Sequence, residues 1–272
     1  MKKKILAVLA LALSFSLVAE GGGLAINIDP LGYMNHTIMT TYDSEKLADN
    51  LKDEFVNAGL IGELQIGDQN SKNVYNAYAL GLDVTYKVFY TSLSLGLPTK
   101  MYSSGFDPIS IMYPGTFKDS NKIGGTIILD GQLGGGVDLM KILKKENNLS
   151  FFVGGGIAVN YVHVKRPVEK DTLLGQKLAS AKTITEFQNI VQAGLGLRAG
   201  VSYYFNPNVG INLNFTDSLH FIKLYSQRMF AGETVAGLQY KYFLTKDGNE
   251  NKMIKRQFAN NFTLRLGASI KF

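Results

Sequence analysis

One stretch in the second half of the chain decides its fold: Val191-Gln192-Ala193-Gly194-Leu195-Gly196-Leu197-Arg198-Ala199-Gly200-Val201-Ser202-Tyr203. Every odd-numbered residue in it is apolar, whereas every even-numbered residue is polar, charged or glycine. Because side chains of a β-strand alternate between its two faces, the pattern predicts a strand with one apolar and one polar face. The polar face is rich in glycine, and small residues suit the crowded interior of a narrow barrel.

The same alternation recurs along the rest of the chain. It is clear from Tyr78 to Val88, and again in the last strand, which ends on Phe272. Read in this way, the sequence predicts about eight strands, near 23–39, 73–88, 89–102, 122–140, 149–165, 188–205, 209–225 and 256–272.

The connections between these strands alternate between short and long. Tight turns are predicted at 88–89, 141–148 and 205–209, where Asn206-Pro207-Asn208 is strong turn chemistry. Long surface loops are predicted near 40–72, 103–121, 166–187 and 226–255, with short helices expected in 44–56, behind Asp43 and Ser44, and in 172–187. Short turns on one side and long loops on the other are typical of outer-membrane barrels, whose short turns face the periplasm.

The predicted fold class is therefore all-β: a closed, antiparallel, up-and-down transmembrane β-barrel. One ambiguity concerns the strand count. Leu238 to Thr245 also alternates and precedes the hairpin pair Asp247-Gly248. We expect this segment to extend a ladder above the membrane, but a barrel of ten strands is the alternative.

The N-terminus predicts export. Met1 is followed by three lysines, then by an apolar run from Ile5 to Val18 and a small residue, Ala19. These are the parts of a cleavable signal peptide, and the apolar run is shorter than the ~20 residues of a membrane-spanning helix. We expect residues 1–19 to be removed, leaving 20–272 as the barrel domain in the outer membrane.

The charge of the exported chain is modest. Residues 1–19 hold three of the 28 basic residues and none of the 22 acidic ones, so the formal net charge falls from +6 to +3. The overall basicity is therefore no sign of nucleic-acid binding. The chain has no cysteine, which excludes disulfides and thiolate chemistry.

The final strand carries a resemblance to a known family. Its outward positions are apolar at every second residue and end on a C-terminal aromatic: Phe262, Leu264, Leu266, Ala268, Ile270 and Phe272. This strand resembles the C-terminal signal of bacterial outer-membrane barrels, which implies recognition by the barrel assembly machinery. The whole layout is similar to small barrels of the outer-membrane protein A transmembrane-domain and opacity-type group. Ile270 stands where such families often carry Tyr.

Charged residues on the inward phase form the first candidate site. They are Asp83, Asp130, Asp138, Arg198, Arg265 and Lys271. Arg198 and Arg265 lie at similar distances from the short-turn end, so Asp83 and Asp130 are their expected partners. The network is expected to be a structural plug, because eight strands leave an interior just wide enough for side chains to fill. A charge gate in a narrow pore is the alternative.

A basic surface loop forms the second candidate site, with Arg228, Lys241, Lys246, Lys252, Lys255 and Arg256. The loop at 43–72 is acidic, with seven acidic against three basic residues. The two loops are expected to attract each other over the barrel mouth, and a patch for anionic ligands is the alternative.

Catalysis is not expected. Ser218, His220 and Asp217 are the residue types of a hydrolytic triad, but strand alternation puts Asp217 on the opposite face. The three histidines are too dispersed for a metal site, and the glycine clusters lie inside strands rather than in phosphate-binding loops. No catalytic residue, cofactor or metal is therefore predicted.

The predicted function is that of a monomeric outer-membrane surface protein. Its lipid-facing wall would contact the outer membrane, and its loops would mediate adhesion, host interaction or envelope integrity by contacting an extracellular ligand. The alternative is a narrow solute channel, or a carrier for small apolar molecules, that uses the barrel lumen.

Overall fold

A computed structural model of the chain describes residues 23–43, 45–46, 69–105, 123–143, 148–168, 181–234, 239–243 and 253–272. It contains nine strands and one short helix: β1 (Leu24–Tyr42), β2 (Gln69–Tyr86), β3 (Phe89–Gly105), β4 (Ile127–Asp138), α4 (Leu139–Ile142), β5 (Leu149–Val168), β6 (Ala181–Tyr204), β7 (Val209–Thr234), β8 (Gln239–Phe243) and β9 (Ile254–Lys271). The predicted signal peptide and much of the predicted long loops lie outside the described residues. In the described part of the chain, no helix has the length and apolar content needed to cross a membrane.

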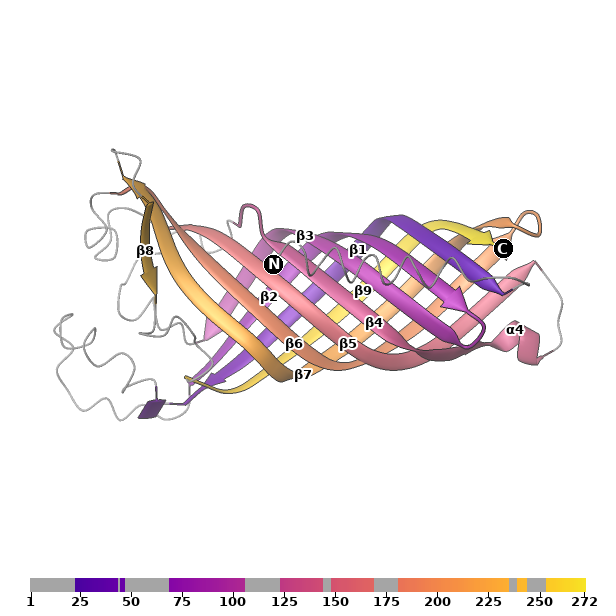
Figure 1. Cartoon of the computed structure of the whole chain (residues 1–272), viewed down its shortest axis with the longest axis horizontal. Coiled ribbons are helices and arrows are strands. Elements are labelled where there is room, and N and C mark those ends of the chain that lie inside the picture. Colours follow the sequence, from indigo (N-terminus) through magenta and orange to yellow (C-terminus); the bar gives the residue numbers. More distant parts are fainter. Residues whose placement is uncertain are drawn as a thin grey trace.

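Eight of the strands close into a ring (Figure 1). Each pairs antiparallel with its neighbours in the order β1, β2, β3, β4, β5, β6, β7 and β9, and β9 returns to β1. The predicted eight-stranded antiparallel barrel is therefore confirmed. The strand β8 does not enter the ring, since among the described strands it pairs with β7 alone, at Met229–Glu233. It lengthens the wall instead of adding a ninth and tenth strand to it.

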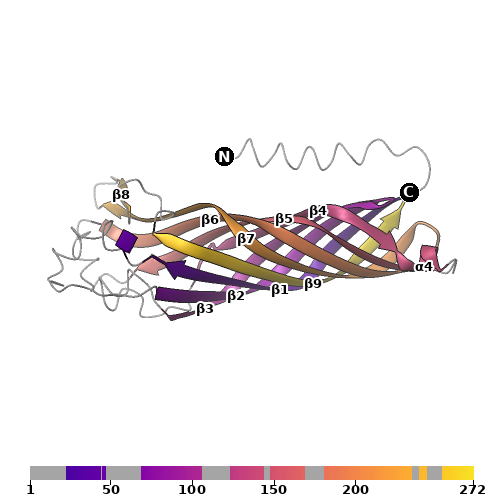
Figure 2. The same cartoon turned by 90° about the horizontal axis from the view of Figure 1, so that it is seen from below.

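The two ends of the barrel differ, as Figures 1 and 2 show. At one end, which we call the short-turn end, lie Lys87-Val88, α4 and the turn 205–208. In that turn the Asn206 side chain accepts hydrogen bonds from the backbone N–H groups of Asn208 and Val209, at 2.9 and 2.8 Å. The first and last residues of the described barrel meet there too, because Gly23 N–H donates to a terminal oxygen of Phe272 at 3.3 Å.

At the opposite, long-loop end the strands reach further than predicted. The strands bounded by Val168, Ala181 and Thr234 extend into the predicted loops 166–187 and 226–255. The predicted helix in 172–187 is wrong for residues 181–187, which belong to β6. Residues 184–187 pair with both β5 and β7, and Ala181 and Thr183 pair with β7, so cross-strand hydrogen bonding overrides the local pattern.

The predicted helix in 44–56 is described only at residues 45–46, which are helical. Asp43 precedes them, and its side chain accepts the Lys46 backbone N–H at 3.2 Å. That bond holds the pKa of the Asp43 carboxyl below its ordinary value. Such a bond is what a helix N-cap supplies.

The two faces of the wall are chemically opposite. On β6 the outward residues Leu195 and Leu197 are 59% and 62% exposed, while the inward Gln192 and Arg198 are almost completely buried. We call the half of the barrel nearest the short-turn end its lower half and the other its upper half. The same contrast holds around the ring, where most large exposed residues are apolar and most buried residues of the lower half are polar. An apolar exterior around a polar interior is the arrangement of a barrel in lipid, the reverse of a soluble protein.

The apolar exterior can be tested at two equally exposed positions. Leu197 lies six residues from Tyr203 at the short-turn rim, roughly 14 Å up an apolar band that is typically about 25 Å tall. Replacing Leu197 by Lys should lower the free energy of unfolding in lipid vesicles by about 2–4 kcal/mol, because the charge enters the middle of the bilayer. Phe205, also 62% exposed, lies at the rim, and Phe205→Lys should cost only about 0–1 kcal/mol. Equal losses would contradict a lipid-facing wall.

Candidate functional site

A buried arginine crosses the lower half of the barrel interior. The guanidinium of Arg265, on β9, donates through Nη2 to both oxygens of Asp83 at 2.9 and 3.1 Å, and through Nη1 to the Leu93 carbonyl at 3.1 Å. Its Nε lies 3.6 Å from the Asp29 carboxylate, and the whole side chain is buried. Arg265 therefore ties β9 to β1, β2 and β3 across the lumen.

A second arginine lies below it, on β6. Arg198 Nη2 is 3.6 Å from Asp83, and Nη1 donates to the Thr85 hydroxyl at 2.9 Å. Its guanidinium also lies 5.5 Å from the ring centre of Tyr90 and 5.0 Å from that of Phe152, which is cation–π geometry. We call Asp29, Asp83, Arg198 and Arg265 the lumen plug. Together with Asn212 and Asn214, which donate to Asp29, they join β1, β2, β6, β7 and β9 across the lower interior.

Glycine makes room for this plug. A Cβ at Gly81, on β2, would lie 1.9 Å from Arg265 Nη1, and one at Gly32 would lie 2.8 Å from its Cγ. The inward glycines Gly134 and Gly156 likewise face each other across β4 and β5 with no space for a side chain. The glycine clusters therefore serve packing, because they let long polar side chains cross a narrow interior.

Asp130 was predicted as an arginine partner, and the structure pairs it differently. Its carboxylate lies 3.0 Å from His220 Nε2 and accepts the Ser218 hydroxyl at 2.9 Å. Gln132 in turn donates to Ser218 at 2.7 Å. Asp217 lies on the outward face, where the Asn260 side chain donates to it at 2.7 Å. Asp130 thus belongs to a second polar layer, with Ser218 and His220, inside the barrel.

Further along the barrel the interior holds a group of apolar side chains, with the polar side chains of His36, Gln257 and Asn261 buried among them. A cluster of buried inward side chains occupies this region: Met34, Ile38, Tyr75, Ala77, Ala79, Met101, Ile128, Val162, Val164, Ile190 and Ala259. We call it the apolar layer. Each of its members is at most 4% exposed. Toward the long-loop end the interior contains Glu186, on β6, whose carboxylate accepts hydrogen bonds from both Arg166 and Arg228.

The barrel wall loses part of its pairing beside the apolar layer. The ladder between β3 and β4 ends at Gly96 opposite Ile128, yet β3 continues to Gly105. Beyond Gly96, β3 pairs only with β2 among the strands that the structure describes. On the other side, Gly124 N–H donates to the Lys165 carbonyl, so the residues before β4 follow β5 and not β3. We call this break in the wall the β3–β4 seam.

The seam is apolar and lies high in the wall. Leu97 and Ile127 flank it on the outside, 40% and 37% exposed, and Met101 and Ile128 flank it on the inside. Pro98 has no N–H to offer a partner strand, as is usual for an edge strand. Leu97 is eight residues from Phe89 at the rim, roughly 19 Å along the barrel axis. The seam therefore begins in the upper part of a band about 25 Å tall.

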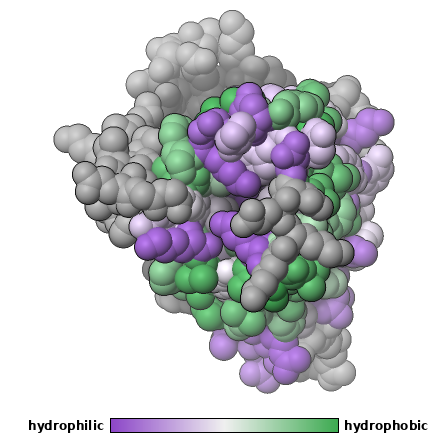
Figure 3. Space-filling model, turned by 90° about the vertical axis from the view of Figure 1, so that its right-hand side faces the viewer, coloured by the Kyte–Doolittle hydropathy of each residue, from purple (hydrophilic) through white to green (hydrophobic). Residues whose placement is uncertain are grey.

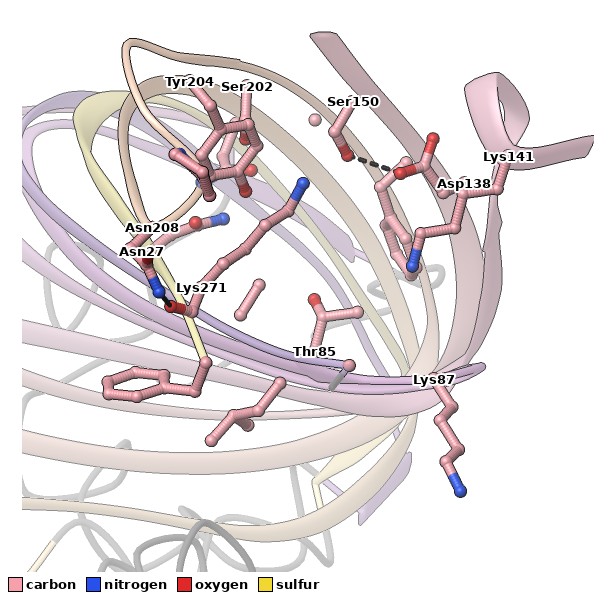
Figure 4. Close-up of a pocket in the computed structure, with 18 of the residues that line it drawn as sticks. Asn27, Thr85, Lys87, Asp138, Lys141, Ser150, Ser202, Tyr204, Asn208 and Lys271 are labelled. Atoms are coloured by element: carbon pink, nitrogen blue, oxygen red, sulfur yellow. Dashed lines mark hydrogen bonds between the residues drawn. The ribbon is translucent and has the colours of Figure 1, made fainter. Parts of the chain in front are cut away.

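A cavity of about 300 Å³ lies below the plug, at the short-turn end. Figure 3 shows this end from outside, with hydrophilic residues near its middle and apolar residues around them. Asp138 and Lys271, which were predicted in the charge network, line this cavity instead of joining the plug (Figure 4). Asp138 accepts from the Ser150 hydroxyl at 2.7 Å, and Lys271 Nζ lies 3.6 Å from the ring centre of Tyr204.

The predicted basic surface loop is divided. Arg228 is not a surface residue, because β7 continues past the predicted loop boundary with Arg228 on its inward face, only 4% exposed. Lys255 and Arg256 are exposed on β9. Lys241 belongs to β8, and Lys246 and Lys252 lie outside the described residues.

The predicted assembly-signal residues share the outward face of β9. Leu264 and Leu266 are 41% and 46% exposed, and Phe272 is 61% exposed at the short-turn rim. Phe272 N–H donates to the Leu24 carbonyl at 2.9 Å, so the last residue is paired with β1. Recognition by an assembly machinery stays a prediction. In the part of the chain that the structure describes, no three acidic or histidine side chains lie close enough to hold a metal ion.

Two interior groups were missed by sequence reasoning. Asp29 precedes Pro30, and the pairing of β1 with both of its neighbours shifts register there, at a β-bulge. The bulge interrupts the alternation of β1, so the sequence pattern does not show that Asp29 faces inward. Glu186 and Arg166 fell within a predicted loop. Extending the alternation of β5 and β6 past the membrane boundary would have found them, because Arg166 and Glu186 are direct cross-strand partners.

Comparison with known families gives one match. A family model described as a domain of unknown function (DUF2715) matches residues 56–272, more than half of the chain. No curated protein matches the chain.

Solved structures of similar architecture are outer-membrane proteins. The outer membrane protein OprG from Pseudomonas aeruginosa is 13% identical, with 93% of this chain and 97% of that chain covered and a TM-score of 0.45. A major outer membrane protein from Thermus thermophilus is 12% identical, with 89% and 99% covered and a TM-score of 0.43. The outer membrane protease OmpT from Escherichia coli is 9% identical, with 94% and 99% covered and a TM-score of 0.42. The likeness is one of barrel architecture.

The plug predicts a large difference between two inward carboxylates. Asp83→Ala should lower the free energy of unfolding by about 3–5 kcal/mol, because it leaves Arg198 and Arg265 buried without their shared partner. Asp138→Ala, at the rim, removes hydrogen bonds at the start of α4 and should cost about 0.5–2 kcal/mol. Urea unfolding of both variants in lipid vesicles measures the difference, and a smaller loss at Asp83 than at Asp138 would contradict the plug.

Proposed function

The chain belongs to the family described as a domain of unknown function (DUF2715), and we propose that it is an outer-membrane barrel that admits small apolar molecules into its upper lumen and releases them sideways into the outer leaflet. The observation that carries this proposal is the β3–β4 seam, an apolar break in the wall beside an apolar interior. The proposal makes specific the carrier alternative reached from the sequence.

An outer-membrane location is supported by the wall itself. Its outward face is apolar, and from the short-turn end up to the β3–β4 seam its strands are paired around the whole ring. The short turns lie at one end and the long connections at the other, which favours a periplasmic short-turn end.

The lumen plug disfavours passage straight through the barrel. Arg265 and Asp83 are both buried and directly bonded, and Arg198 closes the space below them. A solute would have to separate a buried ion pair to pass, which is energetically costly. A molecule that enters from the long-loop end therefore needs another exit.

The apolar layer and the seam supply that exit. Inward Met34 and Met101 are long and flexible, and methionine adapts readily to ligands of different shape. Met101 is also at the seam, where β3 has left β4. An apolar molecule that moves from Met101 past Leu97 reaches lipid without passing the charged side chains of the plug.

Adhesion or host interaction through the loops was the first function predicted from the sequence. Most of the loop residues on which it depends lie outside the described residues, and no observation on the barrel favours it. It stays a prediction, as do the monomeric state and the resemblance to the outer-membrane protein A and opacity-type group.

Closure of the lower lumen predicts the behaviour of the barrel in planar bilayers. The unaltered barrel should give no steady conductance steps in KCl, whereas Arg265→Ala should give them, because it removes the side chain that spans the interior. Arg256→Ala is the matched control, since Arg256 is exposed on the same strand. A closed lumen would be contradicted if the unaltered barrel conducted ions and Arg265→Ala conducted them equally.

The apolar route predicts the uptake of an apolar dye, N-phenylnaphthylamine, by cells that produce the barrel. Met101→Gln should reduce the uptake rate roughly tenfold, because an amide in an apolar passage without a partner costs about 1–3 kcal/mol. Thr91→Gln, on the part of the same strand that is paired with β4, should leave uptake unchanged. The amount of folded barrel is measured in each strain, and equal uptake by both variants would refute the route.

A further inference from the structure

We propose that the cavity at the short-turn end binds a small organic acid, with its carboxylate toward Lys271 and Lys141. This site lies on the opposite side of the lumen plug from the apolar layer, so it does not depend on the proposed transport of apolar molecules. The sequence patterns predict no ligand at this end of the barrel.

Charged groups of both signs surround the cavity. The side chains of Lys141, Lys271 and Arg198 line it, together with Asp138 and the C-terminal carboxylate of Phe272. Arg198 is partly balanced by Asp83 in the plug. Lys141 and Lys271 are therefore the positive groups that an anionic ligand would meet at the mouth of the cavity.

The carboxylate of Asp138 is already engaged. It accepts from the Ser150 hydroxyl at 2.7 Å and from the backbone N–H groups of Met140 and Phe151 at 3.0 and 3.2 Å. In the described part of the chain neither Lys141 nor Lys271 forms an ion pair. Lys271 reaches across the mouth toward Tyr204, as Figure 4 shows, and its Nζ lies 3.6 Å from the centre of that ring. Both lysines are thus available to an anion that enters the mouth.

The deep end of the cavity holds buried polar atoms without protein partners. Arg198 is 2% exposed, and its Nε has no hydrogen-bond acceptor among the described residues. Asn27 is 6% exposed, and its Oδ1 has no donor there either. Leaving such groups unsatisfied is unfavourable, so a ligand with polar atoms would gain from meeting them. This observation is independent of the lysines and points to the same cavity.

The remaining lining limits the size and kind of acid. Phe152, Tyr204 and Leu24 give the cavity an apolar side. A volume of about 300 Å³ is at the small end of ligand sites in proteins. The combination suits a carboxylate attached to a compact apolar body, such as a single ring.

The test uses benzoate as the probe and benzamide as its neutral counterpart of the same shape. The full barrel in detergent micelles is titrated while the backbone amide signals of Ser202 and Tyr204 are followed by NMR. Benzoate should give saturable shifts, and benzamide should bind about tenfold more weakly, because it lacks the charge that the lysines recognise. Lys271→Gln and Lys141→Gln should each weaken benzoate binding about tenfold.

Lys87 supplies the matched control. Its side chain points away from the cavity in Figure 4, so Lys87→Asn removes the same charge from the same rim without touching the site. Asparagine is chosen because Lys87 has a φ of 53°, which asparagine tolerates. Benzoate binding should stay within about twofold of the unaltered barrel. Lys141 lies on the exposed face of α4, so its variant keeps the test valid should Lys271→Gln fail to assemble.

Three results would overturn the proposal. They are the absence of saturable shifts up to about 10 mM benzoate, equal binding of benzamide, and a loss in Lys87→Asn as large as that in the other two variants. Arg198 is left unaltered throughout, because it belongs to the plug and its removal would disturb the barrel itself.

Discussion

The structure depends on one constraint, that backbone N–H and C=O groups in contact with lipid must be paired within the protein. A ring of eight antiparallel strands meets it, and the outward face can then be apolar from Phe205 to Leu195 and beyond. The polar residues of each strand have only the interior left to occupy. The lumen plug therefore results from the closing of the strands into a ring. The β3–β4 seam is the place where the ring is no longer closed by strand pairing.

Closure also explains why the plug has its particular form. Eight strands enclose a space that side chains fill, so a long side chain can cross it only where the opposite wall carries no side chain. Gly81 and Gly32 provide that space for Arg265. The two arginines share Asp83, and Asp29 is held by Asn212 and Asn214, so the buried charges are both paired and hydrogen-bonded. Buried charges persist in proteins under these conditions.

The alternation of the sequence was enough to predict eight strands and the inward phase of Arg198 and Arg265. It could not predict which inward residues meet, because contacts across the lumen depend on the register of many strands at once. Asp130 accordingly joins His220 and Ser218 instead of an arginine. Arg228 was misplaced for another reason: the predicted strand ended at the membrane boundary, whereas β7 runs on to Thr234. The seam and the lower cavity leave no local pattern in the sequence.

The pairing of β1 with β9 has a consequence for how the barrel forms. Most neighbouring strands are joined by short turns or single loops, but Ala25 pairs with Lys271 across nearly the whole chain. That contact carries the largest loop-closure entropy in the ring, so we expect it to form last. Until then β1 and β9 are both open edges, each a template for another strand. The newly made chain is thus most exposed to wrong partners in the interval before its two ends meet.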